Sequence, residues 1–151
     1  MAVKDKRQKA QWQVAGIVEA PVSTVWALLP ENIPSLGPAV RHLTSGDGRD
    51  FQAFKLTTPR ENRVYVEIDQ RAHRIAVQGE WWYRGVYSVE SHERGSLVVY
   101  RVYNIAPGAG WWAARLVQEP QHAREMGRYL AKTLATICDR LGCQFHLLKR
   151  H

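Results

Sequence analysis

The clearest hydrophobic pattern lies near the C-terminus, where apolar side chains recur three and four positions apart. These positions are Met126, Tyr129, Leu130, Thr133, Leu134, Ile137, Cys138 and Leu141. Because residues at this spacing share one side of an α-helix, the pattern predicts a long amphipathic helix. Pro120 is expected to open this helix or to kink an earlier turn. Gly142 is expected to end it.

Upstream, apolar and polar residues alternate, which is the period of a β-strand. Val64, Val66 and Ile68 alternate with Tyr65 and Glu67, for example, as in a sheet with one buried face. The expected strands are 11–20, 40–45, 51–57, 63–70, 73–80, 82–92 and 96–106. A short helix at 22–29 and a helical turn near 31–36 should follow the first strand. Consecutive hairpins favour an antiparallel sheet.

This order of elements predicts an α+β fold with an internal cavity. A helix is only about 10–12 Å wide, so one helix cannot cover a sheet of about seven strands. Gly16, Gly79 and Gly85 occupy strand positions and suit a bent sheet. We therefore expect a curved seven-stranded antiparallel sheet wrapped around the long C-terminal helix, with space left between them.

The junction between the first strand and the first helix points to a known family. Residues 18–29 read VEAPVSTVWALL, which resembles this junction in the START/Bet v 1-like superfamily, also called SRPBCC. Arg101-Val102-Tyr103 and the long final helix agree in position. The resemblance covers residues 11–143 and implies the helix-grip fold of polyketide cyclase/dehydrase-like and lipid-transport-like members. The turn at 69–73, DQRAH, departs from the Asp-Pro turn frequent in the family, which leaves the register of its two strands open.

The resemblance and the expected cavity together imply binding of a small hydrophobic molecule, either lipid-like, sterol-like or polyketide-like and aromatic. Arg101 and Glu80 are expected as polar anchors for the ligand. Arg101 is expected to face inward because the residues that alternate with it on its strand are mostly apolar. A buried arginine needs a partner, which Glu67 or Glu80 could supply. Trp81 is expected to face inward, and hence Trp82 outward. The remaining expected lining residues are Val18, Trp26, Phe54, Val66, Ile68, Val77, Tyr87, Val99, Tyr103, Met126, Leu130 and Leu134.

Two alternatives stay open at this point. One is a polyketide cyclase or dehydratase, with Tyr87, Tyr103 and Glu80 as candidate acid and base groups. The other is a protein-interaction module that uses the basic tails and a sheet edge. The sequence has no nucleotide-binding, phosphate-binding or serine-nucleophile motif, so no cofactor is expected. The six histidines show no pairing at ligand spacing, so no metal site is expected either.

Length and charge set the remaining expectations. The 151 residues fit one domain at 11–145, flanked by a flexible basic tail at 1–10 and another at 146–151. The net charge of +7 is partly terminal and comes with no recognition motif, so specific nucleic-acid binding is not expected. No transmembrane run or secretory signal is seen, so a cytoplasmic location is expected. The chain is expected to be a monomer or a weak homodimer. Cys138 and Cys143 are expected to be reduced structural thiols that a helix would not bring together.

Overall fold

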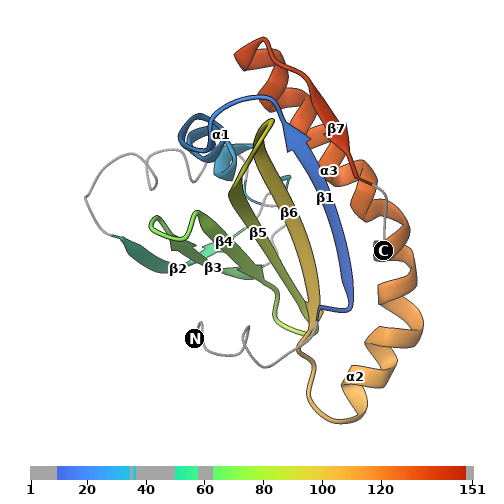
Figure 1. The fold of residues 1–151 in the computed structure, drawn as a ribbon. Helices are drawn as coiled ribbons and strands as arrows, with labels where there is room; N and C mark the ends of the chain where they lie inside the picture. The colour runs from blue at the N-terminus through green and yellow to red at the C-terminus, as the bar shows by residue number, and fades with distance from the viewer. Residues whose placement is uncertain (1–9, 35, 37–49, 58–62, 149–151) are drawn as a thin grey trace.

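The computed structural model describes residues 10–34, 36, 50–57 and 63–148. Among these residues, seven strands form one antiparallel sheet in the order β2-β3-β4-β5-β6-β1-β7. The sheet curves, and the longest helix, α3, runs alongside β1 (Figure 1). The strands are β1 (Trp12–Val18), β2 (Phe51–Thr57), β3 (Arg63–Asp69), β4 (Arg74–Gln78), β5 (Tyr83–His92), β6 (Gly95–Asn104) and β7 (Phe145–Leu147).

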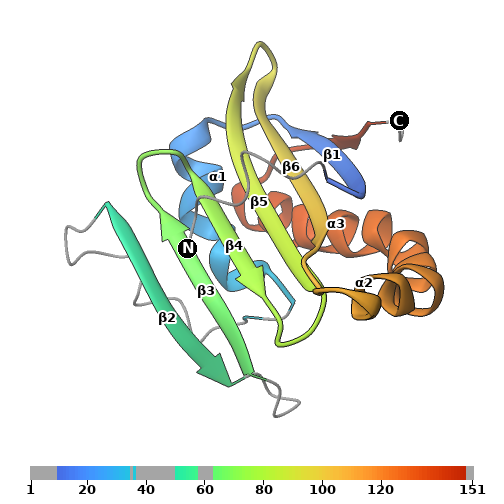
Figure 2. The same ribbon diagram turned by 90° about the horizontal axis from the view of Figure 1, so that it is seen from below.

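The helices cover one face of the sheet, with α1 behind β4 and β5 and α3 behind β6 and β1 (Figure 2). In chain order they are α1 (Val22–Leu28), the 3-10 turn η2 (Pro30–Asn32), α2 (Ala109–Ala113), the π-helical segment η4 (Ala114–Gln118) and α3 (Glu119–Leu141). The predicted curved antiparallel sheet and long C-terminal helix are thereby confirmed.

The C-terminal end of α3 follows the sequence signal, whereas its start does not coincide with a free helix end. Pro120 is the second residue of α3, which continues directly from the π-helical segment η4, so the residue without an N–H stands where the helical hydrogen-bond pattern changes. Gly142 ends the helix with a φ of 68°, and its N–H donates to the Cys138 carbonyl at 2.7 Å. The predicted strand at 51–57 coincides with β2, and the strand predicted at 40–45 lies outside the described residues.

The register left open between β3 and β4 is now defined. Val66 pairs with Val77 and Ile68 with Ile75, so the apolar side chains of both strands share one face. The turn between the strands is held by the Ala72 N–H, which donates to Asp69 Oδ1 at 3.1 Å. The turn therefore preserves the register without proline.

The C-terminal boundary of the domain differs from expectation. Residues 146 and 147 were assigned to a basic tail, but they belong to β7, which pairs with β1 through Val18 and Phe145 and through Gly16 and Leu147. A three-residue edge strand is too short to show alternation, and the return of the chain from α3 places it. The sheet therefore extends beyond residue 145.

The main core lies between the curved sheet and the helices. From the sheet it takes alternate residues such as Val66, Ile68 and Val77, and from α3 it takes Met126, Leu130, Leu134 and Ile137. Gly16 permits the close approach of α3 to β1, since a Cβ there would lie 2.6 Å from Leu134 Cδ1. The core thus follows the two periods seen in the sequence, two in the strands and about 3.6 in the helix.

Candidate functional site

The candidate site lies on the interior face of β5 and β6, under the N-terminal half of α3. Tyr83, Gly85 and Tyr87 share this face on β5, and Tyr100 lies on it in β6, directly opposite Tyr87. The Tyr87 and Tyr100 rings stack with centroids 4.3 Å apart and an interplanar angle of 4°. Both side chains are buried, whereas Tyr83 is only partly buried. The tyrosines therefore extend from the surface into the core.

Gly85 allows Tyr83 to fold back along its own strand. A Cβ at Gly85 would overlap the Tyr83 hydroxyl and would lie 3.0 Å from Tyr100 Cε1. With only hydrogen at this position, the Tyr83 hydroxyl reaches the Tyr100 hydroxyl and hydrogen-bonds to it. The glycine is thus a positioning residue for the pair of phenols.

His122 joins this pair from the first turns of α3. Its Nε2 lies 3.1 Å from the Tyr100 hydroxyl, and its ring makes edge contacts with Trp82 at 5.8 Å and with Tyr83 at 5.2 Å between centroids. Tyr129, two turns further along α3, donates a 2.5 Å hydrogen bond to Glu125 Oε2 and places its ring 6.0 Å from His122. We call Tyr83, Tyr100 and His122 the Tyr–Tyr–His chain.

Burial sets the protonation states of the Tyr–Tyr–His chain. Desolvation raises the pKa of Tyr83 to about 12 and raises the pKa of Tyr100 well above its usual value. Desolvation also lowers the pKa of His122, an effect that the charge of Glu125 partly opposes. At neutral pH the phenols are therefore proton donors, and the imidazole is neutral with one nitrogen free to accept.

The lowered pKa of His122 predicts a pH dependence of stability. Because the unfolded chain binds this proton more readily, the free energy of unfolding should fall as pH drops from about 6.5 through the lower folded pKa. Urea denaturation of the wild type and of His122→Gln between pH 7 and pH 5 measures the effect. The wild type should lose more stability than the variant across this window, and parallel curves would show that His122 is not buried in its neutral form.

The structure places most of the expected lining residues in the core between sheet and helices. One of them, Phe54, is partly buried against this core. The buried members are Val18, Trp26, Val66, Ile68, Val77, Tyr87, Met126, Leu130 and Leu134. Whether they line a ligand cavity stays a prediction. A hollow of about 180 Å³ lies elsewhere, where β1, β7 and α3 meet, and is bordered by Val14, Ala15, Ala123, Arg124, Gly127, Leu147 and Leu148.

Three expected lining residues of β6 lie on the opposite face of the sheet. Val99, Arg101 and Tyr103 alternate with residues of the main core, and Tyr103 belongs to a separate cluster with Ala76 and Val86. Arg101 donates to Gln13 Oε1 at 3.1 Å and to Ser88 Oγ at 3.5 Å. The prediction that these residues face the interior was wrong because it relied on their apolar alternation partners, and both faces of β6 are largely apolar. Tyr103 therefore does not reach the interior as an acid or base.

The buried arginine of the sheet is Arg84 rather than Arg101. Its side chain is 3% exposed, and its Nη2 lies 3.5 Å from Glu67 Oε2, where the Glu67 side chain is 14% exposed. Its Nη1 also donates to Gln78 Oε1 at 3.1 Å. Glu67, expected as a partner for Arg101, serves Arg84 instead.

The segment before β5 also differs from expectation. Glu80 is exposed and is not an interior anchor, and Trp81 is 46% exposed while Trp82 is 9% exposed. The strand begins at Tyr83, so the alternation expected from Trp82 onward does not apply to the turn before it. Trp82 therefore takes the inward place that was expected for Trp81.

None of the three members of the Tyr–Tyr–His chain was among the residues expected at the site. His122 was counted only among six scattered histidines, but it stands four positions before Met126 and seven before Tyr129. That spacing puts it on the apolar side of α3, so the helical pattern itself carried the signal. Within the described residues, no group of three or more His, Cys, Asp or Glu side chains is arranged to hold a metal ion, and no helix is long and apolar enough to cross a membrane.

Comparison with known proteins bears on the fold. No protein-family model and no curated protein matches the chain. Among solved structures, the Zhui aromatase/cyclase from Streptomyces sp. R1128 aligns with a TM-score of 0.50 at 14% identity, over 85% of this chain and 94% of that one. The chain has a helix-grip fold. The protein TTHA0849 from Thermus thermophilus aligns with a TM-score of 0.49 at 12% identity, over 85% of this chain and 98% of that one.

Proposed function

We propose that this helix-grip protein binds a small, largely apolar molecule between the sheet and α3, and that the Tyr–Tyr–His chain holds a polar group of that molecule. The supporting observation is a hydrogen-bonded series of polar side chains at the edge of an otherwise apolar core. Burying hydroxyl and imidazole groups costs free energy that phenylalanine and leucine would not. A binding role accounts for their presence.

The Tyr–Tyr–His chain also indicates the chemistry of the proposed ligand. Its members are neutral at pH 7, and the charged anchors once expected, Arg101 and Glu80, lie outside the core. A neutral hydroxyl or carbonyl therefore suits the site better than a carboxylate. The stacked Tyr87 and Tyr100 rings and the edge-on Trp82 favour a flat aromatic body.

The test is ligand binding measured by calorimetry with 2-naphthol, a long-chain fatty acid and a sterol as probes. We expect 2-naphthol to bind and Tyr100→Phe to weaken its binding by roughly tenfold, as for the loss of one buried hydrogen bond. Tyr65→Phe is the matched control, because Tyr65 is 42% exposed on the outer face. Absence of binding by all three probes, or equal losses in both variants, would contradict the proposal.

A second candidate function is acid–base catalysis of cyclisation or dehydration at the same site. The observation that favours it is a neutral His122 within 3.1 Å of the Tyr100 hydroxyl. His122 would take a proton from a carbon next to a carbonyl, while Tyr100 would donate to the carbonyl oxygen. These residues replace Tyr103 and Glu80 in that role. Conversion of a bound polyketone that falls in His122→Gln by far more than its binding does would distinguish the enzyme from a carrier.

A further inference from the structure

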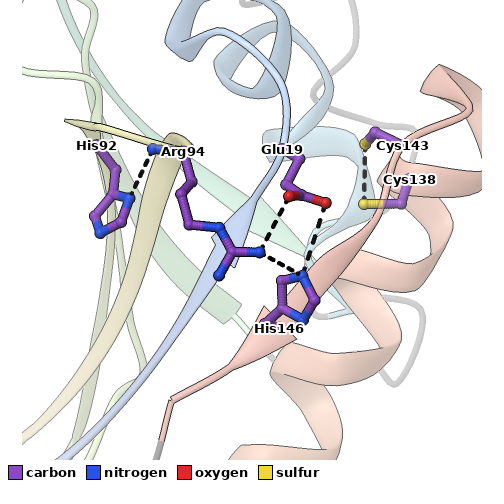
Figure 3. Close-up of polar contacts among 6 residues, drawn as sticks. All are labelled: Glu19, His92, Arg94, Cys138, Cys143 and His146. Carbon is purple, nitrogen blue, oxygen red and sulfur yellow. Dashed lines mark hydrogen bonds and ion pairs between the residues drawn. The ribbon is translucent and has the colours of Figure 1, made fainter.

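Two thiols at the C-terminal end of α3 lie in contact, contrary to the expectation that a helix would keep them apart. The Cys143 Sγ and the Cys138 Sγ are 3.1 Å apart, and both cysteines are free (Figure 3). Five positions along a continuous helix would separate the side chains. The helix ends at Leu141, however, and the left-handed Gly142 turns the chain back toward Cys138.

The backbone holds Cys143 in this place from both sides. The N–H groups of Gly142 and Cys143 both donate to the Cys138 carbonyl, at 2.7 and 3.2 Å. On the other side, the Gln144 carbonyl accepts from the Glu19 N–H at 2.9 Å, just beyond the end of β1. Arg94 and His146 contact the Glu19 carboxylate nearby, which ties β7 to the same corner (Figure 3). The pair of thiols is therefore preorganised.

From this geometry we propose that Cys138 and Cys143 form a redox modification site that closes reversibly to an intramolecular disulfide. A disulfide needs its sulfur atoms about 2.05 Å apart, so a movement of about 1 Å joins these two. The bond would link the last turn of α3 to the segment that leads into β7. This site is separate from the Tyr–Tyr–His chain and does not depend on the proposed function.

The two thiols have different parts in the reaction. Cys143 is partly exposed, whereas Cys138 is buried and desolvation raises its pKa to about 12. With a low-molecular-weight disulfide such as glutathione disulfide as oxidant, the Cys143 thiolate attacks one sulfur and releases one glutathione. Cys138 then gives its proton to solvent and attacks the Cys143 sulfur, and the second glutathione leaves. The protein loses two electrons and two protons, and the oxidant becomes two thiols.

The experiment treats the full chain with glutathione disulfide and measures its intact mass after quenching with an alkylating agent. The wild type should lose two hydrogen masses and accept no alkylating groups, with the intramolecular disulfide exceeding mixed disulfides by at least about tenfold. Cys138→Ser is the matched control and should stop at one glutathione adduct on Cys143. Peptide mapping should find the bond between Cys138 and Cys143.

Three results would overturn the proposal. In the first, both thiols of the wild type remain open to alkylation after the treatment. In the second, glutathione adducts accumulate in the wild type as they do in Cys138→Ser. In the third, the disulfide joins two chains and appears as a dimer on a non-reducing gel. Each result would mean that the contact between the thiols does not direct their oxidation.

Discussion

Gly95→Ala is expected to lower the free energy of unfolding by about 3–5 kcal/mol, because both the backbone conformation and the space at this position exclude a side chain. Gly95 begins β6 with a φ of 133°, which L-residues rarely adopt. An added Cβ would overlap the Val18 carbonyl oxygen and lie 2.7 Å from the Ala20 nitrogen. These are backbone atoms of the last residue of β1 and of the segment that follows it, so no side-chain rotation relieves the contact.

Gly142→Ala provides the matched control for this prediction. Gly142 also has a positive φ, of 68°, but apart from its own chain neighbours no atom lies within 4 Å of an added Cβ. Only the cost of the left-handed conformation remains, about 1 kcal/mol. Urea denaturation of both variants and the wild type measures the difference. Similar losses in the two variants would show that the contact with β1 does not constrain Gly95.

Breaking the Arg84–Glu67 pair is expected to cost about 3 kcal/mol in either single variant, Arg84→Met or Glu67→Gln. Arg84 is 3% exposed, so removing its partner leaves a charge with little access to water. The double variant Arg84→Met/Glu67→Met should recover much of that loss, because it removes both charges and keeps comparable volume. A double-mutant cycle by urea denaturation gives the coupling energy.

An exposed ion pair in the same sheet region serves as the control. Arg71 Nε lies 3.6 Å from Asp50 Oδ2, with side chains that are 85% and 66% exposed. Water screens this pair, so Arg71→Met should change stability by less than about 0.5 kcal/mol. Additive losses in the Arg84 and Glu67 cycle would mean that the two side chains act independently, which would contradict the prediction.

The local periods of the sequence were sufficient for most of the secondary structure. Four core residues of α3, from Met126 to Ile137, were predicted because a helix repeats its apolar side within a few residues. The predicted and observed ranges of β2 coincide because turn-forming residues flank this strand in the sequence. β7 was not, because three residues cannot show a period and their pairing with β1 depends on where α3 ends.

The candidate site needed more than these periods. Alternation gives two faces for β6 but does not say which is interior when both are apolar, so Arg101 and Tyr103 were placed on the wrong one. The contact between Tyr100 and His122 joins a strand to a helix, and only the packing of α3 on the sheet determines it.

By itself, the sequence determined the type and order of the long elements and the apolar sides of α3 and β3, because hydrogen bonds and side-chain directions within one helix or strand repeat over short distances. The tertiary structure alone decided which face of β6 is interior, which arginine is buried, and that Tyr83, Tyr100 and His122 meet. It also decided that Cys138 and Cys143 touch. These contacts depend on how segments far apart in the chain approach one another or on where a helix ends, and a local sequence pattern encodes neither.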